Sequence, residues 1–134
     1  MPAVISKDGT KIAYDKVGKG PAVIVVEGAL VSGEASKPLA RLLAADFTVY
    51  SYDRRGRGDS TDTKPYTAEK EVEDIEALID AAGGTAYLYG ISSGAALALE
   101  AAMSLGDKIK KLALYEAPYD STEAGIKTWR HFIT

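Results

Sequence analysis

The fold of this chain is decided by the stretch Ala86-Tyr87-Leu88-Tyr89-Gly90-Ile91-Ser92-Ser93-Gly94. Its first four residues form an apolar run typical of a buried strand, and the alanine- and leucine-rich residues that follow it favour a helix over Ser93–Ser104. Between the two, the pattern Gly-x-Ser-x-Gly predicts a sharp strand-to-helix turn with Ser92 at its tip. Gly90 and Gly94 allow strand and helix to approach, so the hydroxyl points outward above the positive end of the helix dipole. A generic glycine- and serine-rich loop is the alternative interpretation.

Outward from this turn, strand and helix patterns alternate, which predicts an α/β fold with a mostly parallel sheet. An antiparallel hairpin with a two-residue Asp8-Gly9 turn is expected at the N-terminus. We treat residues 1–134 as one domain. The expected strands are Ala3–Ser6, Lys11–Lys16, Ala22–Val26, Phe47–Tyr52, Ala86–Tyr89 and Ile109–Tyr115, and the expected helices are Lys37–Ala45, Glu69–Ala82 and Ser93–Ser104.

Composition excludes several classes of protein. The 134 residues carry a net charge of −3, so no basic excess exists to neutralise nucleic-acid phosphates. The chain has no cysteine and a single histidine, which excludes disulfides, thiolate metal sites and all-histidine zinc sites. We therefore predict no cofactor and no metal. No apolar run is long enough to span a membrane and no signal sequence is evident, so the expectation is a cytoplasmic protein.

Three stretches resemble the α/β-hydrolase fold family, whose members include serine hydrolases and esterases. They are Gly90–Gly94, the segment Val25-Val26-Glu27-Gly28-Ala29-Leu30, and the segment Tyr52-Asp53-Arg54-Arg55-Gly56-Arg57-Gly58-Asp59-Ser60. The resemblance covers the N-terminal portion of the family fold, from its first strand through its sixth.

This resemblance implies that Ser92 is the nucleophile attacking the carbonyl of a small-molecule acyl substrate. The backbone N–H groups of Ala29 and Ser93 would form the oxyanion hole, with Gly28, Gly90 and Gly94 supporting the loop and the turn. Both segments are expected at the carboxyl ends of adjacent parallel strands, where open α/β sheets bind ligands.

The chain departs from the family pattern in two places. Glu27-Gly28 stands where the family usually has His-Gly, and we expect Glu27 to brace the loop, against Arg54 or Arg55, rather than to oppose the oxyanion. The family also continues through two more strands to its catalytic histidine, so the resemblance ends soon after the sixth strand. His131 has no aligned position, and an exposed histidine is its simpler interpretation. Glu116, directly after the sixth strand, is a candidate triad acid or merely a loop residue, and Asp120 is a weaker candidate.

Two functions remain open from sequence alone. One is a serine hydrolase of small esters or acyl compounds whose base comes from His131, a partner chain or a C-terminal half. The other is a non-catalytic, truncated relative that acts as a binding or interaction scaffold. We expect weak or absent esterase activity for the isolated monomer, since a serine without its base loses most of its activation.

Charged segments and the last strand give three further expectations. The arginines at 54, 55 and 57 could hold an anionic substrate group, but the interpretation we favour is structural, with Asp53 and Asp59 neutralising them in a tight loop. The acidic face of Glu69–Asp80 is expected to be solvated. The apolar strand Ile109–Tyr115 has no later strand to cover its edge, so we expect either a homodimer through it or a tail, Ala117–Thr134, folded back over it.

Overall fold

The computed structural model describes residues 2–28, 37–65 and 67–115. The strands in these ranges are β1 (Ala3–Ile5), β2 (Lys11–Gly18), β3 (Ala22–Val26), β4 (Thr48–Tyr52), β5 (Ala86–Ile91) and β6 (Ile109–Tyr115). The helices are α1 (Lys37–Leu43), α2 (Ala68–Ala81) and α3 (Ser93–Leu105), and a short 3₁₀ turn, η2 (Gly106–Lys108), joins α3 to β6. The predicted elements are thus all present, with ends that differ by one or two residues.

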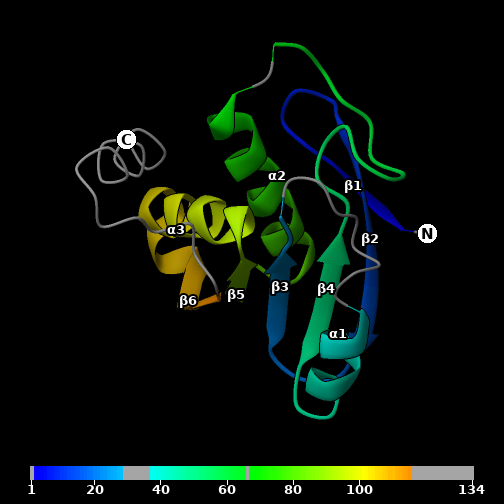
Figure 1. Cartoon of the computed structure of the whole chain (residues 1–134), viewed down its shortest axis with the longest axis vertical. Helices are drawn as coiled ribbons and strands as arrows, with labels where there is room; N and C mark the ends of the chain where they lie inside the picture. The colour runs from blue at the N-terminus through cyan, green and yellow to red at the C-terminus, as the bar shows by residue number, and fades with distance from the viewer. Residues whose placement is uncertain (1, 29–36, 66, 116–134) are drawn as a thin grey trace.

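The strands form one sheet in the order β1-β2-β4-β3-β5-β6 (Figure 1). β2 pairs antiparallel with β1 and with β4, whereas β3, β4, β5 and β6 pair parallel with one another. The predicted mixed sheet, mostly parallel with an antiparallel N-terminal hairpin, is confirmed. Among the strands described, β1 and β6 occupy its two edges.

Helices cover both faces of this sheet because alternate strand residues point to opposite sides. On one face, Ile24 and Val26 of β3 join the larger apolar cluster with Ile75 and Leu78 of α2 and Leu97 of α3. On the other face, a smaller cluster contains Val23, Val25 and Val49 with Ala40 of α1. The central strand β3 is therefore apolar throughout, as a strand buried on both faces must be.

The N-terminal hairpin differs from prediction in its turn. Gly9 N–H donates to the Ser6 carbonyl at 3.0 Å, and Ser6 N–H donates to the Thr10 carbonyl at 2.9 Å. The loop is therefore Lys7-Asp8-Gly9, with Gly9 at φ +88°, rather than a two-residue Asp-Gly turn. A three-residue loop with glycine in the left-handed region is another common hairpin connection, and sequence alone did not separate the two.

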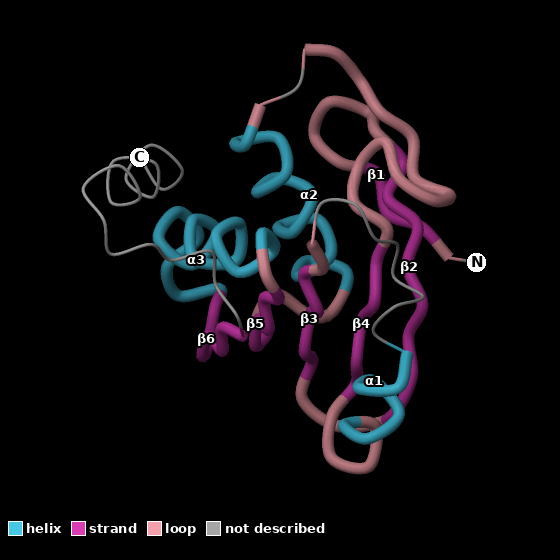
Figure 2. Tube along the Cα trace, viewed as in Figure 1, coloured by secondary structure: helices cyan, strands magenta, loops and turns pink. Residues whose placement is uncertain are grey.

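A long connection between β4 and α2 runs beside the β1–β2 hairpin (Figure 2). It is tied there by hydrogen bonds of 2.9 Å from Ala13 N–H to Ser60 Oγ and from Thr61 N–H to the Lys11 carbonyl. These bonds hold the connection against the hairpin. They also fix the first residues of the connection, Asp53–Arg55, at the carboxyl end of β4. None of the helices in the described ranges is long and apolar enough to cross a membrane.

Candidate active site

Ser92 lies at the turn between β5 and α3, as the Gly-x-Ser-x-Gly pattern predicted. Its backbone has φ 54° and ψ −125°, and among the non-glycine residues described it alone has a positive φ. Its N–H donates to the Tyr115 carbonyl at 2.9 Å, and its own carbonyl accepts from Ala95 N–H at 2.9 Å. Ser92 is exposed, whereas Gly94 and Ala95 of α3 are buried. A non-glycine residue in this region costs about 1–3 kcal/mol, and such strain gathers at functional sites.

The glycines of the turn are there to let α3 approach the sheet. A methyl group on Gly90 would lie 2.7 Å from Ala95 Cα and 2.8 Å from Ala98 Cβ, both in α3. A methyl group on Gly94 would overlap the backbone carbonyls of Val26 and Glu27 at the end of β3. The close contact between strand and helix therefore requires glycine at both positions, which is the steric role that the sequence predicted for them.

The end of β3 lies against the serine turn. β3 and β5 are adjacent and parallel, with Val26 opposite Gly90 in the register. A methyl group on Gly28 would lie 3.6 Å from Ser93 Oγ and 3.8 Å from Ser92 Cβ, so Gly28 is in van der Waals range of the turn. The structure thus brings Gly28, Ser92 and Ser93 together, and Ser93 is the first residue of α3, at the positive end of its dipole. Ala29, the other expected oxyanion-hole residue, lies outside the described residues.

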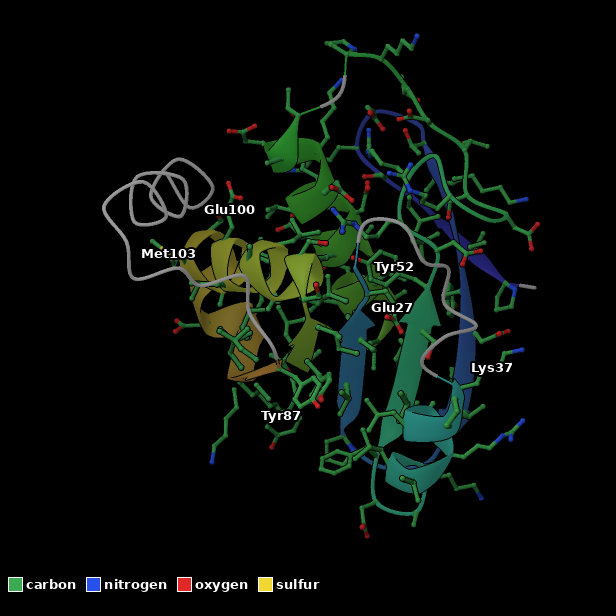
Figure 3. The ribbon with its side chains drawn as sticks, in the orientation of Figure 1. Glu27, Lys37, Tyr52, Tyr87, Glu100 and Met103 are labelled. Carbon is green, nitrogen blue, oxygen red and sulfur yellow. The ribbon has the colours of Figure 1, made fainter. Side chains whose placement is uncertain are left out.

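Arg54 connects this region to α2. Its guanidinium forms a bidentate ion pair with Glu71, in which Nε donates to Oε1 at 2.7 Å and Nη2 donates to Oε2 at 2.6 Å. Its Nη1 also donates to the backbone carbonyl of Glu27 at 3.2 Å. Glu27 itself is buried at the carboxyl end of β3, near Tyr52 of β4 (Figure 3). Arg54 therefore braces the residue that precedes Gly28, through its backbone.

Arg55 is held by two carboxylates. Its Nε and Nη2 donate to the two oxygens of Asp74 at 2.8 and 2.7 Å, and its Nη1 donates to Asp8 Oδ2 at 2.8 Å. The side chains of Arg55 and Asp74 are each only 1% exposed. The hydrogen bonds from Arg55 favour the charged form of Asp8, and they hold the pKa of its carboxyl well below the ordinary range. Asp74, above all, raises the pKa of Arg55 further above its already high value.

These contacts extend one prediction and correct another. The arginines at 54 and 55 are structural, as expected, and their carboxylate partners include Glu71, Asp74 and Asp8, which the sequence did not suggest. The carboxylate of Asp53 instead accepts the N–H of Asp59 at 3.0 Å within the loop. The acidic face of α2 is not wholly solvated either, because Glu71 and Asp74 are buried against the two arginines. No cluster of at least three histidine, cysteine or carboxylate side chains in the described ranges is placed to hold a metal ion.

Three of the predicted site residues are outside the part of the chain that the structure describes: Ala29, Glu116 and His131. The others are all placed, and Gly28, Gly90, Ser92, Ser93 and Gly94 gather at the carboxyl ends of β3 and β5. Sequence reasoning missed Glu71. The available signal was that a buried arginine needs a carboxylate partner.

The chain is similar to several proteins that are named as hydrolases. A crystal structure of an alpha/beta hydrolase from Sphaerobacter thermophilus superposes with a TM-score of 0.87 at 53% identity, over 92% of this chain and 48% of that one. A zearalenone hydrolase of Cladophialophora bantiana is 26% identical over 90% of this chain and 48% of its own length. A proline iminopeptidase of Pestalotiopsis fici is 31% identical over 96% of this chain and 49% of its own. The chain thus spans about half the length of these curated relatives. The model of the alpha/beta hydrolase family matches residues 28–133, which is most of the sequence, and the chain therefore belongs to that family.

Proposed function

We propose that this chain supplies the nucleophile and the oxyanion hole of a serine hydrolase acting on small esters or related acyl compounds. The observation that carries the proposal is the backbone of Ser92, at φ 54° and ψ −125°, on an exposed turn where a strand meets a helix. The family's members named above are hydrolases, which supports the reaction type. Nothing in the turn itself selects among acyl substrates, so the proposal stays at that class.

The proposed chemistry begins with attack of Ser92 Oγ on the carbonyl carbon of the acyl group. A carbon–oxygen bond forms, the Oγ proton passes to a general base, and the carbonyl oxygen becomes an oxyanion. Backbone N–H groups of Ser93 and Ala29 are the proposed donors to that oxygen. Collapse expels the alcohol, which takes the proton from the base, and a water molecule then hydrolyses the acyl-serine ester by the same steps.

The general base is the incomplete part of the proposal. The only histidine of the sequence is His131, which lies outside the described residues. The base is His131 itself, a residue of a partner chain, or a residue of a longer polypeptide that contains this one. We accordingly expect feeble turnover from the isolated chain, because removing the base leaves only the oxyanion hole and substrate binding to act.

A fluorophosphonate probe tests the nucleophile without requiring turnover. Ser92 Oγ displaces fluoride from phosphorus and stays covalently attached, so mass spectrometry locates the adduct. We expect labelling on Ser92 that is abolished in Ser92→Ala and unchanged in Ser104→Ala, which removes another exposed serine from the far end of α3. No labelling of the folded chain, or equal labelling of Ser92→Ala, contradicts the proposal.

The base is tested with a p-nitrophenyl ester. If His131 is the base, His131→Ala lowers the residual hydrolysis and the labelling rate together. Efficient hydrolysis that requires Ser92 and ignores His131→Ala shows that another group takes the proton. In both experiments, circular dichroism of each variant confirms that the fold is retained.

A further inference from the structure

Two contacts fix the backbone carbonyl of Glu27, the first residue after β3. Arg54, just after β4, donates to it through Nη1 at 3.2 Å. The first turn of α3 packs against the same group, because a methyl group on Gly94 would overlap the Glu27 carbonyl oxygen. β3 and β4 run parallel and end beside each other, and α2 and α3 both contact β3 (Figure 1). The carbonyl is therefore enclosed by other parts of the fold and has little freedom to turn.

Arg54 is itself fixed by Glu71 of α2. Its Nε and Nη2 donate to the two carboxylate oxygens at 2.7 and 2.6 Å, and the side chains of Arg54 and Glu71 are only 10% and 4% exposed. Because a guanidinium is planar, fixing two of its nitrogens also fixes the direction of the third, which here is the nitrogen bonded to Glu27. A lysine ammonium has no such plane, so it cannot hold the carboxylate at two points and the carbonyl at a third in this geometry.

The orientation of this carbonyl bears on the serine turn through Gly28. The peptide bond between Glu27 and Gly28 is trans and planar, so the direction of the Glu27 carbonyl sets the plane from which the chain continues. A methyl group on Gly28 would lie 3.6 Å from Ser93 Oγ and 3.8 Å from Ser92 Cβ, so a rotation of this plane changes the contacts beside the nucleophile. Ala29, a proposed oxyanion donor, is the next residue of the sequence.

We propose that Arg54, held by Glu71, is a positioning residue for acyl transfer, which sets the peptide between Glu27 and Gly28 in its place beside Ser92. This inference rests on the proposed hydrolase function. Arg54 acts through a backbone carbonyl and not by contact with the substrate. Donors of an oxyanion hole stabilise charge that develops only in the transition state, so loss of the tie should slow the chemical step without weakening substrate binding.

Arg54→Lys is the variant that isolates this role, because it keeps a positive charge beside Glu71 but removes the planar fork. Arg55→Lys is the matched control, since it makes the same change in the neighbouring residue, which also forms a buried bidentate pair with a carboxylate of α2. The bonds of Arg55 go to α2 and the hairpin loop, not to β3: they are to Asp74, Asp8 and the Lys70 carbonyl. Both variants lose stability, but only the first loses the bond to β3.

Labelling at increasing concentrations of a fluorophosphonate separates the maximal rate of reaction with Ser92 from the half-saturating concentration. We expect Arg54→Lys to lower the maximal rate roughly tenfold or more at an unchanged half-saturating concentration, since a displacement of about 1 Å can cost roughly 100-fold. Arg55→Lys should label like the parent chain at a temperature where circular dichroism shows every variant folded. Glu71→Gln leaves Arg54 in place with a weaker partner, and it should lower the maximal rate in the same direction but by less.

Nuclear magnetic resonance tests the geometry without the chemistry. In a chain labelled with ¹³C and ¹⁵N, one cross-peak links the Gly28 amide to the Glu27 carbonyl carbon. Loss of the hydrogen bond from Arg54 should move this carbon resonance upfield in Arg54→Lys, whereas Arg55→Lys should leave it where the parent chain has it.

The outcomes separate this inference from the proposed function. If Ser92 is labelled in the parent chain and Arg54→Lys or Glu71→Gln reacts at the same maximal rate, the inference is wrong and the proposed function stands. An unchanged Glu27 carbonyl resonance in Arg54→Lys also overturns it, as does an equal loss of rate in Arg55→Lys, which would show a general effect of stability. If Ser92 of the folded parent chain is not labelled at all, the proposed function fails and this inference fails with it.

Discussion

Removing the carboxylate of Asp74 tests whether the buried ion pair between Arg55 and Asp74 stabilises the fold. Asp74→Ala deletes two charge-assisted hydrogen bonds, of 2.8 and 2.7 Å, from a guanidinium whose side chain is 1% exposed. Breaking a buried pair by removing one partner costs about 3–5 kcal/mol, because the other charge stays buried. Asp8 remains bonded to Arg55 at 2.8 Å, so we expect the lower end, about 3 kcal/mol, or a fall in melting temperature of roughly 10 °C.

Urea unfolding followed by circular dichroism measures this loss. Glu73→Ala is the matched control, because it removes a carboxylate from the same helix at a position that is not buried. The double variant Arg55→Met, Asp74→Leu should regain part of the stability, since it removes both charges of the buried pair, although Asp8 loses its hydrogen bond from Arg55. If Asp74→Ala lowers the free energy of unfolding no more than Glu73→Ala does, the ion pair between the β4–α2 connection and α2 does not stabilise the fold.

Further predictions concern the serine turn and the hairpin. Ser92→Gly should stabilise the chain by about 1 kcal/mol, by relieving the positive φ, while abolishing fluorophosphonate labelling; a lower urea midpoint than the parent would show that the turn is not strained. Gly94→Ala should destabilise by about 2 kcal/mol despite the better helix propensity of alanine, because the methyl overlaps β3 backbone; an unchanged midpoint would contradict that packing. Asp8 has a folded-state pKa below its ordinary 3.8, so its contribution is present above that pH and is lost as pH falls towards the folded value. The urea midpoint should therefore drop less between pH 7 and pH 3 in Asp8→Asn than in the parent, and equal drops would refute the assignment.

The sequence predicted the elements well because their patterns are local. Ala22–Val26 and Ile109–Tyr115 match β3 and β6 to the residue. The first is an unbroken apolar run between Pro21 and Glu27, and the second is a mainly apolar segment that lies between Lys108 and Glu116. The serine turn was predicted because its constraints are also local: a strand, a helix and two positions where only glycine fits.

The partners of the arginines were not predictable in this way. Glu71 and Asp74 border the apolar stripe of α2, and helical periodicity does not distinguish a solvated acid from one that faces a distant loop. Asp53 and Asp59 were closer in sequence and offered a simpler neutralisation. The arginines lie 17 and 19 residues from their carboxylates, so only the path of the β4–α2 connection decides the pairing. The residues expected to complete the catalytic set, Glu116 and His131, stay predictions.

The hydrogen bond from Ser92 N–H to the Tyr115 carbonyl has a consequence for how the chain is made. Its acceptor is the last residue of β6, so the serine turn lacks this anchor until Tyr115 has left the ribosome. A nascent chain stalled earlier would present the unpaired edge of β5, with its parallel partner β6 still unsynthesised. Such an edge is a binding site for chaperones and for other nascent chains, so translation pauses between α3 and β6 should lower the yield of native protein more than pauses after Tyr115.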